Sequence, residues 1–60
     1  MSNRVSMSVV EAAEAAGVGA TMVRAEIAAG RLIARRMGKR VLISVEDLRA
    51  YIDNLPRVAA

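Results

Sequence analysis

The 60-residue sequence predicts a small α+β domain in the order helix, tight turn, helix, two-stranded β-hairpin and C-terminal helix. Three observations predict this order. Two serines each precede an acidic residue by three positions and open a helical pattern of apolar residues. A glycine follows each of the first two helical patterns. A basic stretch with strand-like segments separates the second pattern from the third.

The length permits one domain with one small core, because a chain of 60 residues buries only about 60% of the surface that it exposes when unfolded. We therefore expect a single domain over 1–60, ordered over about 8–55. Hydrophobic residues make up 55% of the chain, but many of them are alanine, and Tyr51 is the one aromatic residue. The core must then consist mainly of Val, Ile, Leu and Ala.

The first helix is predicted over 9–16, where apolar residues recur at helical spacing. Ser8 and Glu11 stand at the N-cap and N3 positions of a capping box, in which each side chain bonds to the other residue's backbone amide. Gly17 ends this helix, since glycine tolerates the left-handed conformation found after helix C-termini. Residues 1–7 have no periodic pattern, and we expect them to fray.

The second helix is predicted over 20–29, with Gly30 after its end. At about 100° per residue, the side that packs inward carries Ala20, Val23 and Ile27. The opposite side carries Thr21, Met22, Ala25, Ala28 and Ala29, and Arg24 lies between the two sides.

Residues 31–43 fit a β-ribbon of two strands, 32–37 and 41–43, with Gly38 and Lys39 in the turn. The third helix begins after Ser44, which pairs with Asp47 as a second serine–acid box. Pro56 stops it. The apolar face of this helix consists of Leu48, Tyr51, Ile52 and Leu55.

The net charge of +3 is unevenly distributed. Residues 31–44 hold five cations and no acid, whereas 1–30 and 45–60 each have a net charge of −1. A single basic segment between two mildly acidic ones indicates a polyanionic partner, of which nucleic acid is the commonest. The alternative is a solvated loop that keeps a small apolar protein in solution. The five cations are Arg31, Arg35, Arg36, Lys39 and Arg40.

The residue types that most often carry enzymatic chemistry are missing. The chain has no Cys and no His, which excludes disulfides and thiolate metal sites and removes the commonest general base. We expect no enzymatic activity, cofactor, metal or small-molecule ligand. No apolar run approaches the roughly 20 residues that span a bilayer, and the N-terminus lacks the apolar stretch of a signal peptide. We therefore expect a cytoplasmic protein with no membrane partner.

Several segments, in this order and spacing, carry a family resemblance. They are Ser8–Ala13, Gly17-Val18, Gly30-Arg31-Leu32, Arg36–Arg40 and Ile43–Leu48. They are similar to the S-V-x-E-A-A opening and its later G-V, the G-x-L, the R-I-G-R-R wing and the I-x-x-E-D-L of small excisionase-like DNA-binding domains. These domains belong to the MerR-like winged helix-turn-helix proteins. The resemblance runs from Ser8 to about Leu55.

The resemblance implies that the second helix enters the major groove of double-stranded DNA and that the hairpin is a wing on the neighbouring backbone or minor groove. The implied contacts of the recognition helix are Ala20, Thr21, Met22, Arg24 and Ala25. The implied contacts of the wing are Arg35, Arg36, Lys39 and Arg40. Ser8 and Ser44 are expected to be helix caps.

Several of these residues could instead have purely structural roles. Arg24 could pair with Glu26 or Glu11 and join helices, and Met22 could be packing. The wing cations could be ordinary solvated residues. Tyr51 is expected in the core.

The sequence also departs from the family's pattern. Ala16 replaces a larger residue, Ala25 and Ala28 replace basic ones, and Leu42 replaces a polar one. Gly19 replaces a serine that would cap the second helix, at a cost of about a few tenths of a kcal/mol. The departures predict a lean core and a recognition helix with few polar groups.

Base reading is therefore expected to be poor. Thr and Ala side chains can touch a thymine methyl but cannot make the bidentate bond of arginine to guanine. Arg24 is the one long donor on the helix. Phosphate contacts from the wing would then supply most of the affinity, with a steep salt dependence. We expect a monomer in solution that assembles cooperatively, head to tail, on DNA.

A phage or prophage excisionase, or recombination directionality factor, fits these expectations. Such a protein coats or bends DNA beside a partner integrase. The chain ends a few residues after the third helix, which leaves no room for the dimerisation helix of a MerR-type regulator. Two alternatives remain open: a small MerR-like transcription regulator, and, from a different class, a protein-interaction adaptor that uses an apolar helix face.

Overall fold

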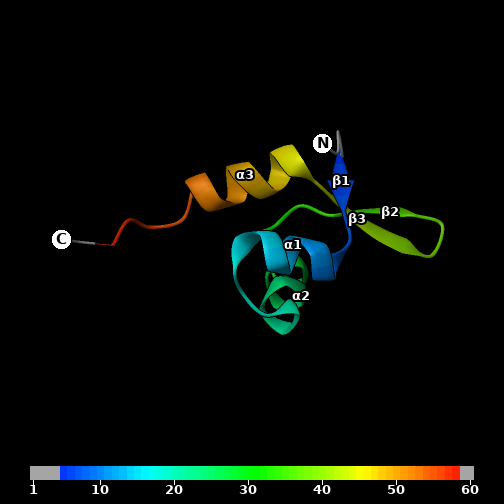
Figure 1. The fold of residues 1–60 in the computed structure, drawn as a ribbon, viewed down its shortest axis with the longest axis horizontal. Coiled ribbons are helices and arrows are strands. Elements are labelled where there is room, and N and C mark those ends of the chain that lie inside the picture. Colours follow the sequence, from blue (N-terminus) through cyan, green and yellow to red (C-terminus); the bar gives the residue numbers. More distant parts are fainter. Residues whose placement is uncertain (1–4, 59–60) are drawn as a thin grey trace.

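The computed structural model describes residues 5–58 and confirms the predicted α+β class and the order of the helices and the hairpin. Figure 1 shows α1 and α2 side by side below α3, and the β2–β3 hairpin extending to one side of the helices. The elements are β1 (Ser6–Met7), α1 (Val9–Ala16), α2 (Ala20–Ala28), β2 (Arg35–Met37), β3 (Arg40–Ser44) and α3 (Val45–Asp53).

Both ends of α1 form as predicted. Ser8 Oγ accepts a hydrogen bond from the Glu11 amide at 3.1 Å, and the Ser8 amide donates to Glu11 Oε1 at 2.9 Å, so the capping box is complete. Gly17 has a φ of 75°, and the amides of Gly17 and Val18 donate to carbonyls of the last turn. This pattern is the Schellman motif, which satisfies carbonyl groups that the helix itself leaves unpaired.

The second helix begins at Ala20 after Gly19, which makes no side-chain cap. It ends at Ala28, one residue before the predicted end, because Ala29 is already the C-cap residue. Val23 is 4% exposed and Ile27 is half-buried, as the predicted inward face requires.

The hairpin turn is confirmed, but the predicted start of the first strand is wrong. Met37 pairs with Arg40, so Gly38 and Lys39 form a two-residue turn. Gly38 has a φ of 62° and no non-glycine residue among 5–58 has a positive φ, which identifies a type II′ turn. The strand begins at Arg35, not at Leu32. Leu32 instead donates its amide to the Glu26 carbonyl at 3.2 Å and belongs to the turn that ends α2.

The expectation that 1–7 fray is wrong for Ser6 and Met7, and residues 1–4 lie outside the described part of the chain. Ser6 and Met7 form β1, which pairs antiparallel with β3 opposite Ser44 and Ile43. The resulting sheet has the order β1-β3-β2, so β3 is its central strand. A strand of two residues is too short for a period of two to appear in the sequence.

The core is small and lies where α1, α2, α3 and β3 meet. Ile43 is the largest fully buried side chain, at 0% exposure. Burying one side chain of this kind stabilises the fold by about 1.5–3 kcal/mol. The other buried core residues are Ala12, Ala13, Val23, Leu32 and Leu48. The alanines allow the helix backbones to approach closely but supply little apolar volume.

The third helix is capped by Ser44, whose Oγ accepts from the Asp47 amide at 2.9 Å, as predicted. It ends at Asp53, three residues before Pro56. The predicted apolar face is only partly covered, since Ile52 and Leu55 remain 42% and 44% exposed.

Tyr51 lies at the edge of the core rather than inside it, because its hydroxyl is engaged by α2. The hydroxyl donates to Glu26 Oε1 at 2.6 Å. Arg31 binds the same carboxylate twice, from Nε to Oε1 at 2.9 Å and from Nη2 to Oε2 at 2.7 Å. We call these three residues the Glu26 tether. The tether connects α2, the segment that follows it, and α3.

The tether shifts the titration of its members. The hydrogen bonds from Arg31 and Tyr51 lower the pKa of the Glu26 carboxyl from its ordinary 4.5 to about 2. The same contact raises the pKa of the Tyr51 hydroxyl. A carboxyl whose pKa is lower in the folded state stabilises the fold above its unfolded pKa, and this contribution is lost as the pH falls towards the folded pKa.

We therefore predict that acid weakens the fold partly through Glu26. Between pH 4.5 and about 2, the melting temperature of the wild-type protein should fall more than that of the Glu26→Gln variant, which has no carboxyl to protonate. Circular dichroism melts at a series of pH values measure the difference. An equal fall in both proteins would show that protonation of this carboxyl does not affect stability.

Candidate nucleic-acid interface

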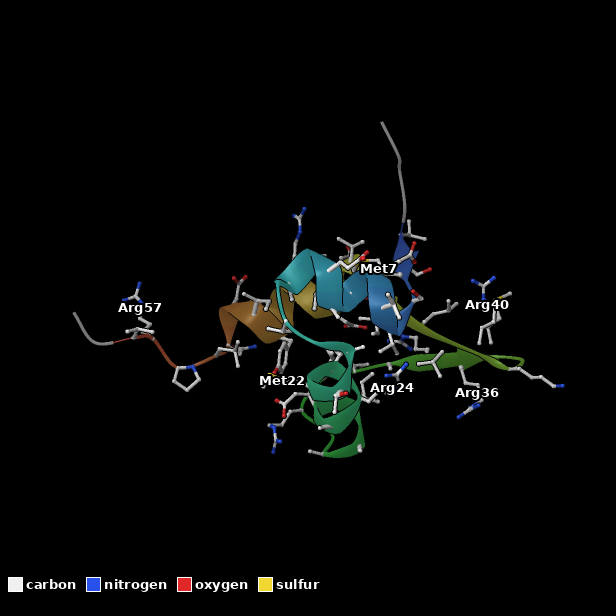
Figure 2. The ribbon with its side chains drawn as sticks, turned by 60° about the horizontal axis from the view of Figure 1, so that its bottom comes forward. Met7, Met22, Arg24, Arg36, Arg40 and Arg57 are labelled. Atoms are coloured by element: carbon white, nitrogen blue, oxygen red, sulfur yellow. The ribbon has the colours of Figure 1, made fainter. Side chains whose placement is uncertain are left out.

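The exposed surface of α2 has two different flanks. Successive residues advance by about 100°, so Arg24 and Met22 stand about 160° apart around the helix. Figure 2 shows Arg24 towards the hairpin and Met22 towards α3. Met22 lines a small apolar pocket with α3 residues that include Leu48 and Ile52. The structure therefore does not bring Met22 together with Arg24, although the sequence placed both at the DNA.

Between these flanks lies the outward face of α2. It is exposed, as predicted, and it carries only small side chains: Thr21, Ala25, Ala28 and Ala29. Ala20, the remaining residue expected at the DNA, is half-buried against the core. Only the hydroxyl of Thr21 can exchange hydrogen bonds on this face. Arg24 is exposed at its edge and is the one long donor there.

The hairpin divides its cations between two sides, because neighbouring residues of a strand point to opposite faces. Arg36 is opposite Val41, whereas Arg40 is opposite Met37 in the next pair of the register. Figure 2 shows the Arg36 side chain below the ribbon, on the side of Arg24, and that of Arg40 above it. Lys39 occupies the turn at the tip. The four predicted wing residues therefore do not form one surface.

Two cations of the basic segment are engaged within the protein. Arg31 is held by Glu26 in the tether. Arg35 lies on the side of Arg40, and its Nε is 4.0 Å from Asp47 Oδ2, a surface pair that contributes little to stability. In the described part of the chain, no ion-pair partner within 4.0 Å faces Arg36, Lys39 or Arg40. The available positive charge is therefore concentrated in the outer half of the hairpin.

Arg24 of α2 is also available to bind an anion. The alternative that it pairs with Glu26 is wrong, because Arg31 and Tyr51 occupy that carboxylate. Across residues 5–58 Arg24 has no ion pair, with Glu11 or with any other residue. Arg24 and Arg36 are thus two exposed guanidinium groups on the same side of the molecule, one from α2 and one from the hairpin.

The sequence patterns did not predict the Glu26 tether. Glu26 and Arg31 are five residues apart, which is not the i, i+3 or i, i+4 spacing of a pair on one helix. They meet because the chain reverses after α2 and brings Arg31 back along it. Tyr51 is 25 residues from Glu26, and nothing in a single sequence indicates that contact.

Residues 5–58 contain no candidate metal site and no candidate membrane span. No group of three or more His, Cys, Asp or Glu side chains in this range could hold a metal ion. None of the helices described is long and apolar enough to cross a membrane.

The features that remain are a helix with an exposed face of small side chains, an adjacent guanidinium group and a projecting basic hairpin. A family model for the helix-turn-helix domain matches residues 6–56, which covers every helix and strand of the structure. Comparison with curated proteins and with solved structures gave no match. The match extends over nearly the whole chain, and it agrees with the paired helices α1 and α2 and their short connection. The protein therefore belongs to the helix-turn-helix domain family and is a DNA-binding protein.

Proposed function

We propose that this protein binds double-stranded DNA as a winged helix-turn-helix domain and acts as an excision factor beside an integrase. In this proposal α2 enters the major groove and the hairpin is the wing on the adjacent backbone. The observation that carries it is the position of Arg24 and Arg36, two guanidinium groups from α2 and the hairpin that lie on one side of the molecule and have no ion-pair partner among residues 5–58.

Most of the affinity comes from phosphate contacts in this proposal. Thr21 and Ala25 offer methyl groups to thymine, and only Arg24 can reach a guanine with two donors. A bidentate pair of that kind discriminates against the wrong base by about 1–3 kcal/mol, so one such residue gives modest specificity. Arg36 and Lys39 are then the main phosphate contacts of the wing. Arg40 and Arg35 lie on its other side and contribute through their charge.

We predict that the double variant Arg36→Ala, Lys39→Ala loses most DNA binding and shows a shallower salt dependence. Each phosphate contact removed should reduce the slope of log K against log [salt] by about 0.9. Mobility-shift titrations at several salt concentrations measure both quantities. The matched control is Arg49→Ala, Arg57→Ala, which removes the same charge from α3 and from the tail at the far end of the molecule. Equal losses in the two double variants would contradict a wing.

A domain with so little base reading would occupy its sites by binding beside other copies. The protein is a monomer in solution in this proposal and assembles head to tail on DNA. We predict sigmoidal binding to a duplex with three adjacent sites, at protein concentrations where a duplex with one site remains mostly free. Mobility shifts on the two duplexes test this, with sites selected from a random pool. A tight, sequence-selective curve on the single site at physiological salt would contradict cooperative assembly.

The excision role predicts a requirement in recombination, because an excision factor shapes the DNA on which its integrase acts. With a purified integrase encoded next to this protein, excision in vitro should depend on the wild-type protein. It should be lost with Arg36→Ala, Lys39→Ala. Unchanged recombination, together with altered transcription from a bound promoter, would indicate the regulator instead. Full function of the double variant would indicate the adaptor. The setting is the cytoplasm of a bacterial host.

A further inference from the structure

Glu26 receives an unusual number of hydrogen bonds for a residue on a helix surface. Its side chain accepts three, two from Arg31 and one from Tyr51. Its backbone carbonyl accepts two more, from the amides of Arg31 at 3.0 Å and Leu32 at 3.2 Å. Three parts of the chain therefore meet at one residue: the C-terminal turn of α2, the segment that leads to the hairpin, and the last turn of α3.

The backbone carbonyl of Glu26 fixes the path of the chain just after α2. Leu32 is 3% exposed and is fixed in the core, while its amide is held by the Glu26 carbonyl. Only Ile33 and Ala34 then separate Leu32 from the first residue of β2. The direction in which the hairpin leaves the body is therefore set within a few residues of Leu32, whose amide the Glu26 carbonyl holds.

The hydrogen bond from Tyr51 fixes α2 relative to the third helix. The third helix follows β3 without a gap, since Ser44 is both the last residue of the strand and the N-cap of the helix. A bond from Tyr51 to Glu26 therefore ties α2 to the helix that continues the hairpin's second strand. The backbone carbonyl of Glu26 therefore holds the first strand of the hairpin relative to α2 through Leu32, and the Glu26 tether holds the second strand through Tyr51 and α3.

We propose that Glu26 is a positioning residue for DNA binding, which fixes the angle between α2 and the hairpin so that Arg24 and Arg36 reach one duplex together. This inference rests on the proposed function. DNA is a stiff partner with fixed groove spacing, and two contacts on separate elements add their affinities fully only when the protein holds them in place beforehand.

Charge alone predicts the opposite sign, which makes the inference testable. Glu26→Gln removes a negative charge from a protein that binds a polyanion, and a simple electrostatic effect would strengthen binding. Loss of positioning would weaken it. Glu14→Gln is the matched control, because Glu14 is an exposed acid on α1 and, among residues 5–58, no ion-pair partner contacts it.

The experiment is a fluorescence titration of a duplex selected from a random pool by the wild-type protein, at four salt concentrations. We expect Glu26→Gln to bind about threefold to tenfold more weakly than wild type, the range for loss of one hydrogen bond. The slope of log K against log [salt] should fall by about one, as the hairpin loses a phosphate contact. Glu14→Gln should bind as tightly as wild type or more tightly. The salt slope separates positioning from simple instability, because a smaller folded fraction lowers affinity without changing the contacts of the folded molecules.

Tyr51→Phe gives a second measurement that leaves the net charge unchanged. It removes one hydroxyl of the tether and keeps the ring, so we expect a loss of about threefold with a reduced slope. Affinities and slopes equal to wild type in both Glu26→Gln and Tyr51→Phe would overturn the positioning role. If thermal melts show that Glu26→Gln is unfolded, Tyr51→Phe alone decides. A wild-type protein that fails to bind the duplex would instead overturn the proposed function.

Discussion

The structure depends on the central strand β3 and on the burial of Ile43 within it. β3 pairs with β1 on one side and with β2 on the other, and it continues directly into α3. Ile43 is fully buried against the helices, and it is the main apolar contact of the sheet with the rest of the fold, beside the partly buried Met7 of β1. With only six buried residues in the described core, two of them alanines, the fold has little other apolar volume to replace this contact.

Because the core is small, polar contacts are more important for holding the elements together. The helix ends are closed by local hydrogen bonds, at Ser8 and Ser44 for the N-termini of α1 and α3 and at Gly17 for the C-terminus of α1. The Glu26 tether connects α2 to α3 at the edge of the core, where apolar packing between them is thin. It also engages the carboxylate of Glu26 on α2 and the guanidinium group of Arg31 just after this helix. Four cations of α2 and the hairpin have no ion-pair partner within the described residues and can bind an anion: Arg24, Arg36, Lys39 and Arg40.

Much of the fold could be predicted because it is encoded over three or four residues. The capping box at Ser8, the N-cap bond at Ser44, the glycine after α1 and the two-residue turn are local, and all of them form where the sequence places them. The reciprocal bond that would complete a box at Ser44 and Asp47 does not appear in the structure. The errors lie where a distant partner decides. Ser6 and Met7 become a strand only because β3 is beside them, and Leu32 leaves the predicted strand because the core and the Glu26 carbonyl hold it.

The sequence by itself determined the three helices, the hairpin turn, the basic segment and the small side chains on the outward face of α2, since each of these is a property of neighbouring residues. Only the tertiary structure decided which cations are available and on which side they lie. Strand register puts Arg36 and Arg40 on opposite faces, and the packing of α2 turns its Arg24 flank towards the hairpin and its Met22 flank towards α3. The reversal after α2 gives Arg31 to Glu26. These outcomes depend on how elements pack against each other, and a linear pattern does not contain that information.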